Sequence, residues 1–591
     1  MSYILGISAY YHDSACCLIY NGKIINAVQE ERFSRIKNDS SFPKESIKWI
    51  LLNNNIFLKD ISSFVFYEKP FLKFERIIES YTAFAPKGFK SFSTFIPEWI
   101  TKKIFLKDLI NKELINIENN KKKNNIYFSE HHMSHAASAF YPSPFEKSAV
   151  LTLDGVGEWD TSTIGIGNKN DIKILEKIHY PHSLGLLYSA FTYYLGFKVN
   201  EDEYKVMGLA PYGKPVYTDI IFKNLIDLKN DGSFRLNLKF FNYATGFTMT
   251  NKNFSKLFGK NIRKNNETIT EFHMNIASSI QKVTEIIIIR ICEYIKKKYK
   301  LNNLCVAGGV GLNCVANGLI KKLNLFDNIW IQPASGDAGG ALGAALSYYY
   351  QHEGNLRKIS NKDSMNNSYL GPRYNNEEIK KDFISNKISF EEFKDERLLE
   401  YITNEIQKGK IIGWMQGSLE FGPRALGNRS IIADPRNEEM QKRLNLKTKF
   451  RESFRPFAPI VLEEQLSDWF DLDTRSPYML LVAQVKKNKL INVNSKKNHT
   501  LDDINEKRSQ IPSVTHVDMS ARIQTISKEN GKIYDLLKLF YKKTNCPVLI
   551  NTSFNLSGEP IVSSHMDAYQ SFMVSDIDIL VCENLVIKKF S

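Results

Sequence analysis

Short runs of apolar residues at the start of the chain predict β-strands. Residues 3–31 contain YILGIS, SACCLIY and KIINAVQEE, and the last two runs flank Asn21-Gly22. Asn-Gly between apolar runs is the strongest short signal for a β-hairpin. A polar loop with His12 separates the first two runs. We therefore expect three short strands, with a polar loop at the end of the first.

The same pattern returns from residue 149 onward. The run AVLTLD ends at Asp154, the loop GVGEWDTS follows, and the runs TIGIG and IKILEKI flank a turn at residues 168–171. This is an internal repeat. Two copies of a strand, an Asp/Gly-bearing loop and a hairpin resemble the duplicated ATPase fold of actin, Hsp70 and sugar kinases. That fold is α/β, and its two loops face each other across a nucleotide.

Apolar spacing predicts a long helix, and a polar segment predicts a domain boundary. Residues 271–300 carry apolar side chains at steps of three and four, which is typical of a core helix. Residues 351–367 are polar and rich in Gly, Asn and Lys, which favours a linker. We expect two domains, residues 1–360 and 361–591.

Length, charge and cysteine content limit the classes of binding partner that we expect. At 591 residues the chain is too long for one core. Its net charge of +15 would suit nucleic acid, but lysine runs such as residues 296–298 lie in Asn/Ile/Lys-rich surroundings, so we do not expect that partner. Seven cysteines without a C-x-x-C pair predict reduced, buried thiols of a cytoplasmic protein. The apolar run around residues 286–291 is too short to span a membrane, so we expect no membrane partner.

A basic stretch, residues 417–459, is the strongest candidate site. Its basic residues are interleaved with Gly and Pro and are Arg424, Arg429, Arg436, Arg443, Lys447, Lys449, Arg451 and Arg455. Arginine binds phosphate and carboxylate through two parallel donors, and glycine lets backbone N–H groups approach an anion. The stretch predicts a site for a phosphate or acyl phosphate. The alternative is a basic surface patch.

Two glycine-rich turns predict a nucleotide site. LCVAGGVGLNCVAN (residues 304–317) is a buried strand that runs into a turn and a helix, and PASGDAGGALGAA (residues 333–345) follows. Glycines allow close backbone approach to adenosine and its phosphates, while a helix N-terminus favours an anion. The expected nucleotide-binding residues are Gly308, Gly309, Gly311, Asn313, Gly336 and Gly339.

Histidines at helical spacing suggest a metal site. His131 and His135 lie at i and i+4 in HHMSHAASA, on one face of the expected helix. This spacing lets two imidazoles share a metal. A pair of hydrogen-bonded helix histidines is the alternative.

Together these motifs resemble the O-carbamoyltransferases that modify nodulation factors, antibiotics and related natural products. The resemblance covers nearly the whole chain through GISAYYHDSA, QEERFSR, HHMSHAASAF, LDGVGEW, HSLGLLYSAFTYYLGF, YKVMGLAPYG, AGGVGLN, SGDAGGALGAA, EFGPRALGNRSI, KFRESFRPFAP and NTSFNLSGEPIV. One departure is Met519-Ser520, where relatives commonly have Gly-Thr, which puts the tight turn before Arg522 in question.

The resemblance implies two activities. The first domain would resemble the enzyme that completes threonylcarbamoyladenosine on tRNA, and the second a YrdC-like, acyl-adenylate-forming domain whose last part packs back on the first. The second would convert carbamoyl phosphate and Mg-ATP to carbamoyl-adenylate and pyrophosphate. The first would pass the carbamoyl group to a hydroxyl of a small-molecule acceptor over a metal, Fe or Zn.

The resemblance also assigns roles to residues. The carbamoyl phosphate and ATP site would use Lys449, Arg522, Asn551 and Ser553 with Arg424, Arg451 and Arg455. The metal would be held by His131, His135 and Asp337, with Asp154 at the nucleotide. His12 would be a general base on the acceptor hydroxyl or would position the carbamoyl group.

Two other functions fit part of the pattern. An actin-fold kinase would explain the hairpins and glycine turns but not the arginine-rich stretch. A tRNA-modification enzyme would fit the positive charge. The acceptor, the metal and the oligomeric state, for which a homodimer is one option, are not encoded in any motif.

Overall fold

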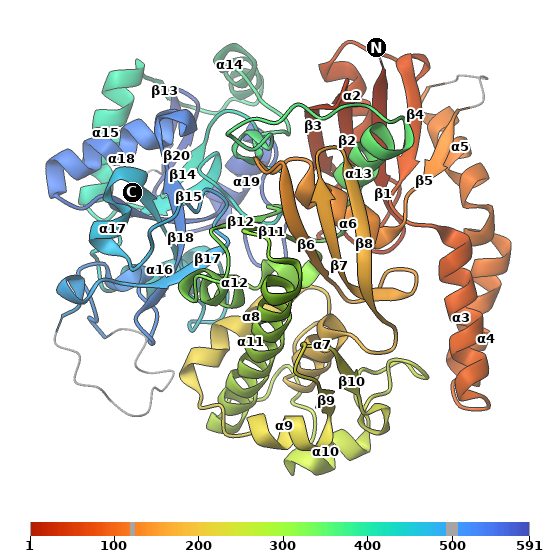
Figure 1. The fold of residues 1–591 in the computed structure, drawn as a ribbon. Helices are drawn as coiled ribbons and strands as arrows, with labels where there is room; N and C mark the ends of the chain where they lie inside the picture. Colours follow the sequence, from red (N-terminus) through yellow and green to blue (C-terminus); the bar gives the residue numbers. More distant parts are fainter. Residues whose placement is uncertain (1, 119–123, 492–505, 590–591) are drawn as a thin grey trace. The chain divides into compact units, whose positions relative to one another are not determined.

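The computed structural model describes residues 2–118, 124–491 and 506–589 and divides into two compact units (Figure 1). The first comprises Met1–Glu30 and Asn38–Ser364, and the second comprises Glu31–Lys37 and Met365–Ser591. The sequence-based division put residues 31–37 in the first domain, whereas the structure groups them with the second unit. Arg32 Nη2 donates to the Gly422 carbonyl at 2.8 Å, so the segment is bound to the second unit.

The described part of the first unit contains two five-stranded sheets of the same design (Figure 1). One has the order β3-β2-β1-β4-β5 and the other β12-β11-β6-β7-β8, so in each the first three strands form antiparallel hairpins and the last two pair in parallel. The repeat is confirmed. The strands are β1 Tyr3–Ser8, β2 Ala15–Tyr20, β3 Lys23–Gln29, β4 Ile61–Phe66, β5 Ile126–Phe128, β6 Lys147–Leu153, β7 Asp160–Asn168, β8 Asp171–His179, β11 Asn303–Ala307 and β12 Asn328–Ile331.

Strand β3 ends two residues earlier than the sequence predicts. Glu30 turns out of the strand, and its carboxylate accepts hydrogen bonds from the backbone N–H groups of Glu45 and Ser46 and from the Ser46 hydroxyl. Those N–H groups lie in the first turn of α2, where unpaired donors favour an acidic partner. Glu30 therefore binds the start of α2 and does not continue the strand.

Helices follow the fifth strand of each sheet at equivalent places. They are α6, His131–Phe140, and α13, Asp337–Ser347, and they pack on each other while α13 also packs on β1. A Cβ atom at Gly343 would lie 1.7 Å from the Ser134 carbonyl oxygen, and one at Gly6 would lie 1.8 Å from the Ala341 carbonyl oxygen. These distances leave no room for a side chain, so both contacts require glycine.

The other elements of the first unit surround these sheets. The expected core helix is confirmed as α11, Glu271–Tyr299, with its apolar face buried. The remaining elements are α2 Lys44–Asn53, α3 Pro70–Phe84, α4 Phe89–Thr101, α5 Leu106–Ile117, α7 Leu184–Tyr194, α8 Glu203–Leu209, α9 Thr218–Asn224, α10 Lys252–Phe258 and α12 Cys314–Lys322, with the hairpin of β9 Ile226–Leu228 and β10 Phe234–Leu236.

In the second unit, the described residues form one mixed nine-stranded sheet, ordered β13-β21-β20-β14-β15-β19-β16-β18-β17. The predicted α/β class is confirmed. The elements are α1 Glu31–Ser34, α14 Asn376–Ser385, β13 Glu391–Glu392, α15 Asp395–Gln407, β14 Ile412–Met415, β15 Arg429–Ala433, α16 Met440–Arg443, β16 Ala458–Leu462, α17 Leu466–Trp469, β17 Leu481–Gln484, β18 Ser520–Ile526, α18 Lys532–Thr544, β19 Val548–Ser553, α19 His565–Val574, β20 Ile579–Cys582 and β21 Leu585–Lys588.

The tight turn before Arg522 is kept despite the unusual residues. Met519 has φ of 64°, in the left-handed region that favours glycine. The Met519 N–H donates to the His516 carbonyl at 2.9 Å, and the Ser520 hydroxyl donates to Asp518 at 2.7 Å. The turn is therefore held by hydrogen bonds, and methionine adopts there a conformation that costs about 1–2 kcal/mol for a non-glycine residue.

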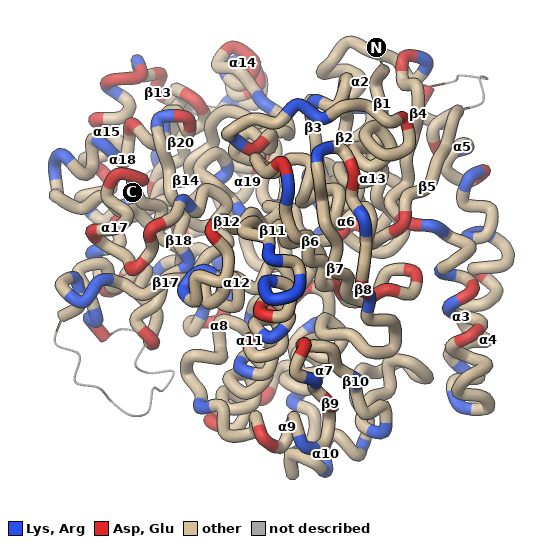
Figure 2. The backbone as a smooth tube through the Cα atoms, viewed as in Figure 1, with Lys and Arg blue, Asp and Glu red and all other residues tan. Residues whose placement is uncertain are grey.

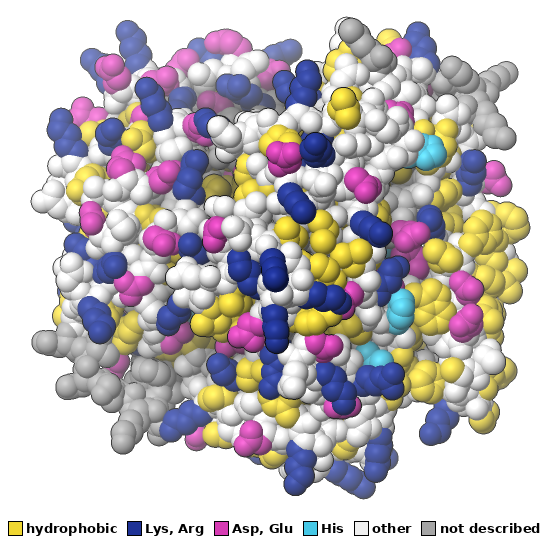
Figure 3. All heavy atoms as spheres, in the orientation of Figure 1, with side chains coloured by type: hydrophobic (Ala, Val, Ile, Leu, Met, Phe, Trp, Pro, Cys, Tyr) yellow, Lys and Arg dark blue, Asp and Glu magenta, His cyan; other side chains and the backbone are white. Residues whose placement is uncertain are grey.

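The cysteines are buried, as expected from the sequence, and the charged residues of both signs are mixed. All seven cysteines are buried and free. Basic and acidic residues are interspersed along the backbone of each unit (Figure 2) and over the face drawn in Figure 3. The lysines at residues 296–298 end α11, where the helix dipole favours cations, and Lys298 pairs with Glu176 at 3.0 Å. Of the helices described, none has the length and apolar character to cross a membrane.

The glycine contact between α6 and α13 is testable by substitution. Gly343→Ala should destabilise the protein by about 2 kcal/mol or more, because the new methyl group forces the helices apart. Gly336→Ser is the matched control, since Gly336 is the N-cap of the same helix with nothing within 4 Å of a built Cβ. The control should change stability by no more than about 0.5 kcal/mol. Equal thermal melting of the two variants would contradict the contact.

Candidate functional site

Four acidic and imidazole side chains converge in the first unit. His131 and His135 lie one turn apart on α6, Asp154 follows β6, and Asp337 opens α13. One ligand atom from each lies within 4.8 Å of the others, and all four residues are buried. His131 Nε2 is 3.0 Å from Asp154 Oδ2 and 3.1 Å from His135 Nε2, and His135 Nε2 is 3.6 Å from Asp337 Oδ1. We call these four residues the His/Asp cluster.

The cluster has the charge and donors of a metal site. Burial would raise the pKa of Asp154, yet hydrogen bonds from His131 and His135 hold it well below its usual value. Burial also opposes ionisation of Asp337, but His12 and His135 lower its pKa to about 2. Two buried carboxylates so close together are unfavourable without a cation. Two imidazoles and two carboxylates suit Fe or Zn, so the residues fit the implied metal.

His12 lies beside this cluster. Its Nε2 is 3.7 Å from Asp337 Oδ2 and its Nδ1 is 3.1 Å from Asp13 Oδ2. Burial lowers the pKa of His12, but Asp337 and Asp13 outweigh it and raise the pKa to about 9. In this form the imidazole is a hydrogen-bond donor. The positive φ of Tyr10 and Asp13, 71° and 52°, turns the loop that carries it.

Two residues near the cluster were missed by the sequence prediction. The Tyr67 hydroxyl lies 3.5 Å from Asp337 Oδ2. The Glu158 carboxylate accepts the His131 backbone N–H at 3.0 Å and the Lys69 N–H at 2.7 Å. Glu158 stands in the motif LDGVGEW, four residues after Asp154, so this motif offered a signal for it. Tyr67 follows a buried strand and offered none.

The glycines of the two turns divide into packing and open positions. A Cβ at Gly308, Gly311 or Gly339 would lie within 2.5 Å of Leu153 O, Ser335 Oγ or Ala334 O, respectively. Gly336 has nothing within 4 Å of a built Cβ, and at Gly309 the nearest atom is Asp154 Oδ1 at 3.0 Å. The two open positions can admit a ligand, whereas the other three are required by packing.

Two polar groups tie these turns to the His/Asp cluster and to α11. The Gly309 N–H donates to Asp154 Oδ1 at 2.9 Å, so Asp154 belongs to both the metal-type cluster and the glycine turn. Asn313 caps α12 through the Ala316 N–H at 3.1 Å. Its amide also exchanges hydrogen bonds with Gln281. Asn313 therefore has a structural task that the sequence prediction did not include.

A buried lysine is the centre of a second site, in the second unit. Lys449 Nζ donates to the Ser553 carbonyl at 2.6 Å, to the Ser553 hydroxyl at 3.2 Å and to Asn555 Oδ1 at 2.6 Å. Burial lowers the pKa of Lys449 well below its usual value, and Arg451 and Arg455 lower it further. None of its three hydrogen-bond partners is a carboxylate. Neutral groups therefore hold the ammonium, and Glu559 is a carboxylate whose charge opposes the lowering of its pKa.

Arg451 and Arg455 flank Lys449. Arg451 Nε donates to Asn445 Oδ1 at 2.7 Å, and its guanidinium lies 4.7 Å from the centre of the Phe457 ring. Arg455 Nη1 lies 3.8 Å from Glu452. The predicted residues Lys449, Ser553, Arg451 and Arg455 are therefore neighbours. We call them the Lys449 cluster.

Asn551 holds a neighbouring loop. Its amide donates to the Ala425 carbonyl at 3.1 Å and to Gln524 Oε1 at 2.5 Å, and Gln524 in turn donates to Leu426 at 2.8 Å. This loop carries Arg424. Arg522 lies on β18 two residues before Gln524, so their side chains share one face of the strand. Asn551 and Gln524 thus fix the backbone beside Arg424.

Other arginines of the basic stretch, which were not assigned to the site, have structural partners. Arg429 is fully buried and donates to backbone carbonyls, including Gln416 O at 2.7 Å and Pro372 O at 3.2 Å. Arg436 pairs with Asp434 at 2.6 Å, and Arg443 pairs with Asp576 at 2.8 Å and Asp578 at 2.9 Å. Spacing along the sequence cannot separate these roles.

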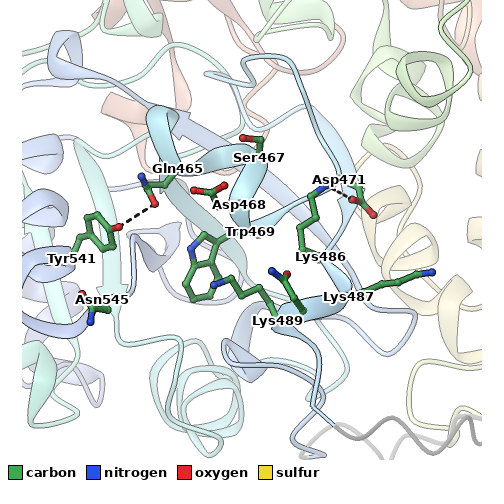
Figure 4. Close-up of a pocket in the computed structure, with 11 residues that line it drawn as sticks. Gln465, Ser467, Asp468, Trp469, Asp471, Lys486, Lys487, Lys489, Tyr541 and Asn545 are labelled. Carbon is green, nitrogen blue, oxygen red and sulfur yellow. Dashed lines mark hydrogen bonds and ion pairs between the residues drawn. The ribbon is translucent and has the colours of Figure 1, made fainter.

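A hollow of about 800 Å³ in the second unit contains none of the predicted site residues (Figure 4). Trp469 forms part of its lining, with Lys489 Nζ 4.3 Å from the ring centre, and Tyr541 donates to Gln465. Lys486 pairs with Asp471 at 2.8 Å. Because none of the residues that the sequence motifs indicate lines this hollow, we place the candidate chemistry at the two clusters instead.

The chain is similar to known proteins over most of its length. An uncharacterized protein of Synechocystis sp. is 52% identical over all of this chain and 97% of that protein. Nodulation protein NolNO of Sinorhizobium fredii is 35% identical over 98% of this chain and 80% of that protein. Among solved structures, T. kodakarensis HypF is 14% identical over 60% of this chain and 48% of that chain, with a TM-score of 0.33, too distant to support an argument.

The family models match both parts of the chain. Residues 3–346, which include the His/Asp cluster, match the carbamoyltransferase N-terminus. Residues 403–589, which include the Lys449 cluster, match the carbamoyltransferase C-terminus. The chain therefore belongs to the carbamoyltransferase family and is a carbamoyltransferase.

Proposed function

We propose that this carbamoyltransferase is ATP-dependent and forms O-carbamates through carbamoyl-adenylate. The observation that carries the proposal is the Lys449 cluster, a buried lysine flanked by two half-buried arginines and beside amide and hydroxyl groups, in the C-terminal family region. Carbamoyl phosphate joins an anionic phosphate to a planar amide, and such a ligand needs both kinds of partner.

In the C-terminal unit, two reactions would take place in sequence. Water cleaves carbamoyl phosphate to carbamate and inorganic phosphate, and a carbamate oxygen then attacks the α-phosphorus of Mg-ATP with loss of pyrophosphate. Lys449, Arg451 and Arg455 would stabilise the phosphate charge, with Arg424 and Arg522 as further cations. Asn551 would hold the loop of Arg424, and Ser553 would orient Lys449.

In the N-terminal unit, the carbamoyl group would pass to an acceptor hydroxyl, and AMP would leave. His131, His135 and Asp337, with Asp154 as a fourth ligand, would hold the metal. When bound, Fe or Zn supplies Lewis acidity that polarises a carbonyl group. His12 would donate a hydrogen bond that positions the carbamoyl group, and the space at Gly309 and Gly336 would admit the nucleotide.

The acceptor is proposed to be a small hydroxylated molecule. The nodulation proteins among the relatives fit this class by resemblance to their family. No nucleic acid or membrane is needed for the reaction. The alternative function is that of an actin-fold kinase, which would release ADP.

Turnover should convert ATP to AMP and pyrophosphate and release inorganic phosphate from carbamoyl phosphate. Each is a required product of the adenylate route, in equal amounts with the carbamate ester. We would measure all of them with a panel of hydroxylated acceptors. Formation of ADP without AMP would identify a kinase and reject the proposal.

The two half-reactions should separate by mutation. Lys449→Ala should slow carbamoyl-phosphate-dependent exchange of pyrophosphate into ATP by about 10²-fold, because it removes a preorganised cation. It should spare transfer from chemically prepared carbamoyl-adenylate. His131→Ala should slow transfer and spare exchange.

Elemental analysis supplies the independent readout for the His/Asp cluster. Protein purified without chelator should contain stoichiometric Fe or Zn, and His131→Ala should lose it. Intact metal content and intact transfer in His131→Ala would give this residue a structural role only. Equal loss of both half-reactions in both variants would indicate one composite site.

Anion binding at Lys449 should take up protons. Because burial lowers the pKa of Lys449, its uncharged form is favoured in the free protein more than in water, and a bound phosphate dianion favours the ammonium. The uptake should occur above the lowered pKa and disappear as pH rises past the pKa in the complex. Calorimetry with inorganic phosphate in mildly alkaline buffers of different ionisation enthalpy measures it. Lys449→Gln should abolish the uptake, and unchanged uptake would contradict the assignment.

A further inference from the structure

The segment Glu31–Lys37 belongs to the second unit although its sequence neighbours belong to the first. Arg35 is its main attachment beside Arg32. The two terminal nitrogens of Arg35 donate to Ile561 O at 2.7 Å and Pro560 O at 3.0 Å, and its Nε lies 3.7 Å from Asp567. Each nitrogen of the guanidinium therefore faces an oxygen of the second unit.

The loop that Arg35 contacts is the loop on which Lys449 depends. Asn555 accepts from Lys449 Nζ at 2.6 Å and donates to the Glu559 carbonyl at 2.7 Å. The next two carbonyls, of Pro560 and Ile561, accept from Arg35. The Arg35 guanidinium and the Lys449 ammonium are thus connected through one loop, by hydrogen bonds at each end and by the backbone from Glu559 to Ile561 between them.

Arg32 makes a similar attachment to the other loop of the site. It is buried, its Nη2 donates to Gly422 O at 2.8 Å, and its Nη1 pairs with Glu31 at 3.0 Å. Gly422 lies two residues before Arg424. The segment therefore contacts both the loop of Arg424 and the loop of Ser553 and Asn555.

Lys37 adds charge to the same place. It lies two residues after Arg35 and contributes to the positive field at Lys449. Its side chain is half-buried. A third cation beside Arg451 and Arg455 increases the attraction of this place for an anion.

We propose that Arg35 is a positioning residue for the anion site of the second unit, and that the segment Glu31–Lys37 completes this site. Arg35 holds the Pro560–Ile561 backbone and thereby sets Asn555 and Lys449 in the geometry that binds carbamoyl phosphate. Loss of its two hydrogen bonds leaves two carbonyls in a buried part of the loop without these donors, and the loop must move to satisfy them. The inference rests on the proposed function for the identity of the anion.

The test uses full-length Arg35→Met and Arg35→Lys. Arg35→Met should weaken carbamoyl phosphate binding, measured by calorimetry without ATP, by about tenfold or more, as expected for loss of two hydrogen bonds that involve a charged group. Pyrophosphate exchange should lose kcat/KM mainly through KM for carbamoyl phosphate. Transfer from prepared carbamoyl-adenylate should stay within threefold, roughly the spread of ordinary surface substitutions. Arg35→Lys keeps the charge but not the paired donors, and should lie between.

Arg357→Met is the matched control. Arg357 also clamps backbone carbonyls, of Phe140 at 3.0 Å and Phe145 at 2.8 Å, but it lies in the first unit. It should leave carbamoyl phosphate binding unchanged. A generally destabilised protein would instead lose binding, exchange and transfer together.

The outcomes separate the inference from the proposed function. Wild-type-like carbamoyl phosphate binding in Arg35→Met, or parallel loss of binding and transfer in soluble Arg35→Met and Arg35→Lys, would overturn the positioning role. Wild-type protein that binds carbamoyl phosphate without ATP–pyrophosphate exchange would reject the adenylate route, while the binding comparison would still decide the role of Arg35.

Discussion

The first unit depends on the burial of two carboxylates and two imidazoles within a few ångströms of one another. Such a group is stable only if the backbone holds it rigidly and a cation balances its charge. Rigid placement comes from glycine. Gly343 lets α13 touch α6, and Gly6 lets β1 touch α13, so Asp337 is carried to the histidines by main-chain contact rather than by a flexible side chain. The geometry of the His/Asp cluster is therefore encoded partly in glycines that contribute no ligand atom.

The second unit also buries a charged group, but this group is a cation, Lys449. Lys449 is buried against neutral acceptors, so its ammonium gains no ion pair in exchange for lost hydration. A protein keeps such a group where a ligand supplies the missing charge. The arginines of the basic stretch have two different roles. Arg451 adds positive charge beside Lys449, whereas Arg429 donates its hydrogen bonds to backbone carbonyls. Arginines of the basic stretch thus both support the fold and contribute to the candidate anion site.

Local patterns predicted those parts of the structure that depend on local interactions. The Asn21-Gly22 turn, the repeated hairpins and the helix of His131 and His135 follow from turn chemistry and periodicity, and the structure has all of them. Patterns could not place Asp154 in the His/Asp cluster, because its partners come from two distant helices. Nor could they reveal that Arg35 reaches Pro560, some 525 residues away. Such contacts are set by tertiary packing, which leaves no period or spacing in the sequence.

The opposite charges of the two clusters bear on the order of chemistry. Phosphate groups carry negative charge, so they are drawn to Lys449, Arg451 and Arg455 and repelled by Asp154 and Asp337. A nucleotide approaches the first unit more easily the more fully cations neutralise these carboxylates, and an adenylate, with one phosphate, suffers less repulsion there than ATP with three. For the proposed route, this division of charge favours adenylate formation in the second unit and transfer in the first. If the His/Asp cluster holds a metal as proposed, the ion would add positive charge to that of His12 and His135, whose pKa values are both raised to about 9 by the neighbouring carboxylates, and so would further reduce the repulsion of the intermediate.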